Sequence, residues 1–219
     1  MASPESISKP ISAVVDALLE SLRAHDPYSY GHCKRVGKNA SLLAELAGLN
    51  PFEQRLAEYA GLLHDIGKVG IPDQILKKQG ALTESEEEVM RTHCLKSVAI
   101  VSPLAYLPFF RALLPAIRHH HERIDGLGYP DGLHSRDIPV LARIVTIADA
   151  FDAITTRRPY RDQSPDGLAY QELQAHSGTQ FDIGLAKLFV AQHPTWAGET
   201  PDLGVQATRV LDQPDSSAA

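Results

Sequence analysis

The chain has 219 residues, of which 43% are hydrophobic and 22% charged, and its formal net charge at pH 7 is −6. These values predict one globular domain with at most a short appendage, and they argue against a general surface for nucleic-acid polymers. No run reaches the roughly 18 apolar residues of a membrane span, and no signal peptide opens the chain. With only Cys33 and Cys94, a disulfide framework is not expected, and the reducing cytoplasm is the default compartment.

Apolar residues recur at helical spacing through most of the chain, which predicts an all-α fold. A first amphipathic helix is expected over residues 5–24. It ends at residues 25–27 (His-Asp-Pro), because proline disfavours helical angles in the residue before it. A second helix is expected to close near Gly48.

Two capping boxes mark further helix starts. Asn50 with Glu53 opens a helix that runs to about residue 65, and Thr83 with Glu86 opens the helix expected to carry His93. Later helices are expected at about 104–121, 139–157, 164–177 and 182–192.

Two internal stretches, residues 67–82 and 124–138, are rich in turn-forming residues and are predicted to be loops. The second is long for a compact helical domain, and loops of that length are usually functional. The expected organisation is an N-terminal helix for packing or linkage (1–25), a main domain (26–193) and a weakly ordered tail (194–219).

The adjacent pair His64-Asp65 suits a site between two metal ions, with the histidine on one ion and the carboxylate bridging both. One such pair is weak evidence, since residues 25–26 form another. More telling is a set of imidazoles and carboxylates in or beside apolar helical segments, where an unliganded polar group is costly. The alternative is that each is hydrogen-bonded separately in the core. The set comprises His32, His64, Asp65, His93, His120, His121 and Asp149.

Over roughly residues 26–190 the chain resembles the HD-GYP family. The matching residues are HDIGK at 64–68, HHERIDGLGYPDGL at 120–133, IADAFDA at 147–153 and RRPYR at 157–161, with Asp26, Tyr28, Ser29, His32 and His93. The resemblance implies a single helical-bundle HD domain with a long GYP loop. It also implies metal-dependent hydrolysis of cyclic di-GMP by a metal-bridging hydroxide.

The resemblance further implies a role for each matching position. His32, His64, Asp65 and Asp149 would bind one metal ion, and Asp65, His93, His120 and His121 a second. Asp65 and Lys68 would be catalytic, and Lys68, Tyr129, Arg158 and Arg161 would bind substrate. Iron or manganese is expected first, with nickel, cobalt or zinc as alternatives.

Members of the family with a third metal resemble one another in a glutamate four residues before the first histidine ligand. Tyr28 holds that position here. We therefore expect two ions, and cleavage mainly to the linear dinucleotide pGpG.

Several neighbouring residues are predicted to stay outside the metal site. Cys33 and Cys94 each follow a proposed ligand, and adjacency on a helix is expected to turn them away as buried free thiols. His119 is expected to be structural or exposed, and Glu122 and Asp125 are expected to fix the loop. Asp152 is expected to orient Lys68 or a ligand, or else to cap a helix or lie at the surface. For Asp26, a role in the site and a helix stop both stay open.

Two other functions stay open at this point. One is a different enzyme of the HD superfamily, acting on a nucleotide or phosphomonoester. The other is a degenerate module that binds a dinucleotide or a diguanylate cyclase without turnover. In relatives the first helix often leads to a receiver or sensory domain. Its apolar face is expected to pack on its own bundle or on a second copy in a homodimer.

Overall fold

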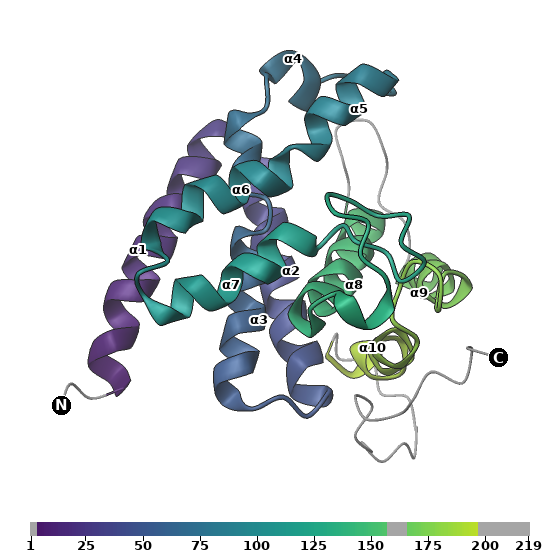
Figure 1. The fold of residues 1–219 in the computed structure, drawn as a ribbon. Coiled ribbons are helices and arrows are strands. Elements are labelled where there is room, and N and C mark those ends of the chain that lie inside the picture. Colours follow the sequence, from purple (N-terminus) through teal and green to yellow (C-terminus); the bar gives the residue numbers. More distant parts are fainter. Residues whose placement is uncertain (1–3, 157–165, 197–219) are drawn as a thin grey trace.

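The computed structural model describes residues 4–156 and 166–196, and these are helical nearly throughout (Figure 1). No strand forms within these two ranges, which confirms the all-α prediction. The helices are α1 (Pro4–His25), α2 (Pro27–Leu46), α3 (Pro51–Leu63), α4 (Asp73–Leu76), α5 (Glu84–Arg91), α6 (His93–Val101), α7 (Pro108–His119), α8 (Val140–Thr155), α9 (Asp166–Ala175) and α10 (Ile183–Trp196), with 3-10 turns η1 (Ile66–Gly70), η2 (Ser102–Leu104) and η3 (Ser135–Asp137).

Helices α2, α3, α7 and α8 form the centre of the bundle, where α2 packs on α3 and α8, and α3 packs on α7 (Figure 1). The most extensive contact is between α2 and α3. A Cβ added to Gly61 would lie 2.8 Å from Gly37 Cα, so only glycine fits there. This contact brings the N-terminal half of α2 beside the end of α3.

The first helix packs on its own bundle. Val15, Leu19 and Leu22 are at most 1% exposed, and α1 lies against α2, α3 and η1. Asp26 then ends α1 and starts α2, because its carboxylate accepts a hydrogen bond from Tyr28 N and from Ser29 Oγ.

Three predicted boundaries were wrong. The helix expected to carry His93 breaks: α5 ends at Arg91, and His93 begins α6. The Thr92 hydroxyl donates to the Val89 carbonyl at 2.6 Å, which favours a stop at that point. The predicted loop 67–82 contains η1 and the short α4, and α10 continues through residues 194–196 of the predicted tail.

The loop after α7 is held by a buried acid. Glu122, which is 2% exposed, accepts backbone N–H hydrogen bonds from Asp131 at 2.7 Å and Leu133 at 3.0 Å. Tyr129 N also donates to the carbonyl of His121 at 3.1 Å. The loop therefore returns to the end of α7, beside the paired histidines.

Candidate metal centre

The seven residues expected to bind metal come from separate parts of the chain and meet at one place in the bundle. They are His32 on α2, His64 at the end of α3, Asp65 in the following turn, His93 at the start of α6, His120 and His121 after α7, and Asp149 on α8. Five of them are at most 3% exposed, and the other two are partly buried. Burial of so many polar groups costs free energy unless each group has a hydrogen-bond partner or binds a metal ion.

The carboxylate of Asp65 lies between two groups of side chains. Its Oδ2 is 3.6 Å from His32 Nε2 and 3.4 Å from His64 Nε2, whereas its Oδ1 is 3.3 Å from His93 Nε2. Asp149 Oδ1 joins the first group, 3.0 Å from His32 Nε2. The two oxygens of one carboxylate thus face two clusters that could each hold a metal ion.

Backbone carbonyls fix the orientation of the imidazole rings. Nδ1 of His64, His93 and His120 each lies 2.7–2.8 Å from the carbonyl oxygen three residues earlier. A neutral ring that donates through Nδ1 leaves its Nε2 lone pair for a ligand bond. Nε2 of His93 and Nε2 of His120 lie 3.2 Å apart. Within the described ranges, His64 Nε2 and Asp65 Oδ1 are buried without a hydrogen-bond partner. Such converging atoms suit a cation.

Protonation differs between the two sides of the centre. Burial holds the pKa of His120 well below its usual range and lowers the pKa of His121 to about 3. Burial also acts on His32, but hydrogen bonds with Asp149 and Asp152 outweigh it and raise the pKa of that imidazole. A proton therefore competes with a cation more strongly at His32 than at His120 and His121.

Asp152 lies directly behind His32. Its Oδ2 is 2.7 Å from His32 Nδ1, and its two oxygens accept hydrogen bonds from Arg35 at 2.5 and 3.0 Å. Asp152 thus orients a proposed ligand, one of the roles expected for it, rather than Lys68. Burial raises the pKa of Asp152, but its hydrogen bonds to His32 and Arg35 outweigh burial and lower the pKa overall.

A cavity of about 560 Å³ opens onto the cluster, a volume typical of small-molecule sites. Lys68 and Tyr129 both line it. Lys68 Nζ lies 2.5 Å from Asp65 Oδ2, and the Tyr129 ring stacks on His121 with centroids 4.9 Å apart. The other residues expected to bind substrate, Arg158 and Arg161, lie outside the described residues.

The two cysteines do not turn away from the centre, and this part of the prediction was wrong. Cys94 Sγ is 3.5 Å from His93 Nε2 and 3.9 Å from His120 Nε2. Cys33 groups with His64 and Asp65. Both are free thiols and fully buried, as expected. Cys94 follows a helix break, and Cys33 lies on α2, which packs against both α3 and α8, so direction along one ideal helix is a poor guide there.

The remaining neighbours serve the loop. Glu122 binds backbone N–H groups of the loop, and Asp125 accepts from Arg123 and from Leu127 N. His119 Nδ1 faces carboxylates of Glu122 and Asp131 at 3.5–3.7 Å. These contacts agree with the structural roles expected for His119, Glu122 and Asp125.

Three residues near the site were not predicted from the sequence. Arg35 buttresses Asp152, and its spacing of three from His32 was a usable signal. Met90 lines the cavity, and the Arg91 guanidinium lies 5.2 Å from the centroid of the Tyr129 ring. Nothing in the sequence pairs the end of α5 with the GYP loop.

The HD domain family model matches residues 16–185. The chain belongs to the HD domain family. Its resemblance to the HD-GYP branch is also confirmed. A cyclic di-GMP phosphodiesterase of Thermotoga maritima is 38% identical over 165 residues, covering 75% of this chain and 45% of the relative. The 3'3'-cGAMP-specific phosphodiesterase 3 of Vibrio cholerae is 35% identical over 169 residues, covering 76% and 36%.

A solved structure supports the fold. The HDG"Y"P protein Bd1817 from Bdellovibrio bacteriovorus superposes with a TM-score of 0.60 at 22% identity, over 73% of this chain and 50% of that one. The chain spans less than half the length of the two curated relatives. None of its described helices combines the length and the apolar character needed to cross a membrane.

Proposed function

We propose that this HD domain is a metal-dependent phosphodiesterase that hydrolyses cyclic di-GMP. The observation that carries the proposal is the placement of Asp65, whose two oxygens face two separate histidine clusters at 3.3–3.6 Å. One carboxylate between two sets of imidazoles is the ligand arrangement of a dinuclear centre.

The residues present fit two ions. The unpartnered buried atoms of His64 and Asp65 and the Nε2 lone pairs of His93 and His120 are donors that need a cation. His32, His64, Asp65 and Asp149 would hold the first ion, and Asp65, His93, His120 and His121 the second. Imidazole and carboxylate donors suit iron or manganese, with nickel, cobalt or zinc as alternatives. When bound, the ions would acidify a water molecule and counter the charge of the phosphodiester.

Lys68 and Tyr129 would hold the substrate. Burial lowers the pKa of Lys68, but the charge of Asp65 outweighs burial and raises it to about 12, so this amine is a cation in the cavity at neutral pH. Burial raises the pKa of Tyr129, whose hydroxyl is therefore a neutral hydrogen-bond donor. A cation and a donor beside the metal cluster suit a phosphate oxygen. Arg158 and Arg161 stay predicted contacts to phosphate or guanine.

We further propose two ions, with the linear dinucleotide pGpG as the main product. Tyr28 occupies the place where a glutamate would help to hold a third ion. Its ring stacks on His32 with centroids 6.4 Å apart. Asp26, two residues earlier in the chain, uses both oxygens to cap α2. Tyr28 has no carboxylate, and both oxygens of Asp26 already accept hydrogen bonds within α2.

The test is removal of the central carboxylate. Asp65→Ala and His64→Ala should abolish hydrolysis of cyclic di-GMP and reduce bound metal, because Asp65 is proposed to hold both ions. Metal content is measured by elemental analysis after anaerobic purification, and products by chromatography. Asp73→Ala is the matched control, since Asp73 is an exposed aspartate paired with Lys77. Full metal content and activity in the Asp65 variant would contradict the proposal.

The cyclic dinucleotide preferred is a separate question, because one relative is named for cyclic di-GMP and another for 3'3'-cGAMP. Comparison of kcat/KM for both substrates on the same preparation decides it. A module that binds without turnover would bind the dinucleotide and release no product. Presence of every proposed ligand in the cluster favours the enzyme.

The compartment and the partners also stay proposals. Two free thiols suit a reducing cytoplasm. A receiver or sensory domain, a diguanylate cyclase and a second copy of this chain stay predicted partners.

A further inference from the structure

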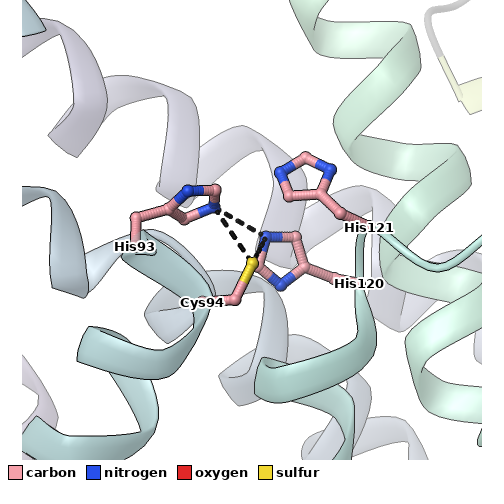
Figure 2. Close-up of side chains that lie close together, drawn as sticks. All are labelled: His93, Cys94, His120 and His121. Atoms are coloured by element: carbon pink, nitrogen blue, oxygen red, sulfur yellow. Dashed lines mark hydrogen bonds between the residues drawn. The ribbon is translucent and has the colours of Figure 1, made fainter. Parts of the chain in front are cut away.

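Cys94 points its sulfur into the space between the histidines of the second cluster. Figure 2 shows Cys94 Sγ beside His93 and His120, with His121 facing the same space. The side-chain donor atoms of these four residues all lie within 4.8 Å of one another. Cys94 is fully buried. It is absent from the ligands that the family resemblance assigns.

The spacing of the donors matches ligands around one ion. Metal–nitrogen bonds of about 2.0–2.1 Å and metal–sulfur bonds of about 2.3 Å at tetrahedral angles place nitrogens about 3.4 Å apart, and nitrogen and sulfur about 3.6 Å apart. Nε2 of His93 and Nε2 of His120 lie 3.2 Å apart. Cys94 Sγ lies 3.5 Å from the first of these atoms and 3.9 Å from the second.

A thiol that only donates a hydrogen bond explains less. One S–H satisfies one acceptor, whereas both Nε2 atoms are left as acceptors by the Nδ1 contacts of their rings with Met90 and Ile117. Asp65 Oδ1, also buried and without a hydrogen-bond partner among the described residues, lies 3.3 Å from His93 Nε2. A cation would satisfy all of these atoms together.

The break after α5 explains how two neighbours can both point inward. His93 and Cys94 are the first two residues of α6, next to the end of α7. A negative ligand is also favoured in the first turn of a helix, where the macrodipole is positive.

We propose that Cys94 is a further ligand of the second metal ion, beside Asp65, His93, His120 and His121. This inference rests on the proposed metal centre. A thiolate makes the second site softer than the first, whose proposed ligands are nitrogen and oxygen donors. The second site should therefore favour zinc, iron or cobalt over manganese, and the two sites should differ in metal preference.

Cobalt(II) tests the proposal without any assay of activity. The full chain is loaded anaerobically with Co²⁺, and thiolate ligation is read from a near-ultraviolet sulfur-to-cobalt charge-transfer band. The band should be present in the wild type and in Cys33→Ser, the matched control at the other buried thiol, and absent in Cys94→Ser. X-ray absorption of the wild type should show sulfur at about 2.3 Å from the metal.

The remaining outcomes are decisive as well. One such outcome is a wild type that binds cobalt and shows neither the charge-transfer band nor sulfur scattering. That result overturns the role of Cys94 but does not contradict the dinuclear centre. A band that survives in Cys94→Ser and is lost in Cys33→Ser also overturns it. No bound cobalt at all contradicts the metal centre itself. If Cys94→Ser fails to fold by circular dichroism, the X-ray absorption of Cys33→Ser decides instead, because Cys94 is the one thiol left in that variant.

Discussion

At the scale of single residues, two side chains outside the proposed ligand set contact the proposed ligands directly. Asp152 holds His32 from behind at 2.7 Å, and Lys68 approaches Asp65 from the cavity at 2.5 Å. Both contacts are charge-assisted and largely buried, so they should be stronger than exposed ion pairs.

Asp152→Asn should weaken metal binding at the first site by roughly 10–100-fold, because His32 loses the carboxylate that fixes its ring. The second site, which shares Asp65 only, should lose less. Titration of the metal-free protein with Mn²⁺ measures both affinities. Asp182→Asn is the control, since Asp182 pairs with an arginine, Arg143, elsewhere in the fold. Equal affinities in the Asp152 variant and the wild type would show that His32 needs no such support.

Lys68→Ala should keep both metals and lower kcat by on the order of 100-fold, as expected when one preorganised charge beside a reacting phosphate is removed. Lys77→Ala, at the rim of the same cavity, should have a much smaller effect, because Lys77 is half-exposed and paired with Asp73. Metal content and turnover are measured on the same samples. Loss of metal in proportion to activity would make Lys68 a structural residue.

At the scale of elements, the centre depends on how closely η1 approaches α6. Gly67 N donates to Ser97 Oγ at 2.8 Å, and the same hydroxyl donates to the carbonyl of His64 at 2.7 Å. These bonds tie the turn that carries Asp65 to the helix that carries His93. The contact between η1 and α6 therefore fixes how far Asp65 lies from His93.

Gly67→Ala should destabilise the fold by about 1–3 kcal/mol or more, and it should weaken the second metal site. A Cβ there would lie 2.2 Å from His93 O and 2.4 Å from Ser97 N, so backbone must move. Urea unfolding of the metal-free protein and metal titration measure the two effects. In Gly70→Ala the new Cβ meets only the flexible side chain of Lys96, and little change is expected. Wild-type stability and metal affinity in Gly67→Ala would mean that η1 and α6 can move apart without cost.

For the whole molecule, metal should act as part of the core. Segments from α2, α3, α6, α7 and α8 meet at the centre, so ions bound there join parts of the chain that are distant in sequence. Because the unfolded chain cannot present these ligands together, binding free energy becomes folding free energy.

Removal of metal should therefore lower Tm. Each site contributes about 2.7 kcal/mol when free metal is 100 times Kd, or roughly 5–10 °C for a domain of this size. Calorimetry after chelation and after addition of Mn²⁺ or Co²⁺ tests this. Mg²⁺ is the control, since it prefers oxygen ligands and should restore little in a site rich in imidazole. A Tm indifferent to Mn²⁺ and Co²⁺ would contradict a structural contribution of the ions.

The sequence by itself determined the helices, most of their ends and the kinds of side chain available at the centre. Helical periodicity and caps are local, and Asn50 with Glu53 forms its capping box within one turn, as predicted. The kinds of residue also limited the chemistry, because histidines and aspartates in apolar segments need partners wherever they lie. The break at Thr92 was missed, since its hydroxyl competes with the helix through a contact that residue type alone does not require.

Only the tertiary structure decided which atoms meet. The contact of His32 with Asp152 joins residues 120 apart, and no local rule chooses that partner over Lys68. Cys94 points at His93 and His120 because α6 starts anew after α5 and docks against α7. The direction of a side chain at a helix break depends on the packing of whole elements. Sequence spacing therefore gave the wrong direction for the thiol beside the break, because the packing of α6 on α7 decides where it points.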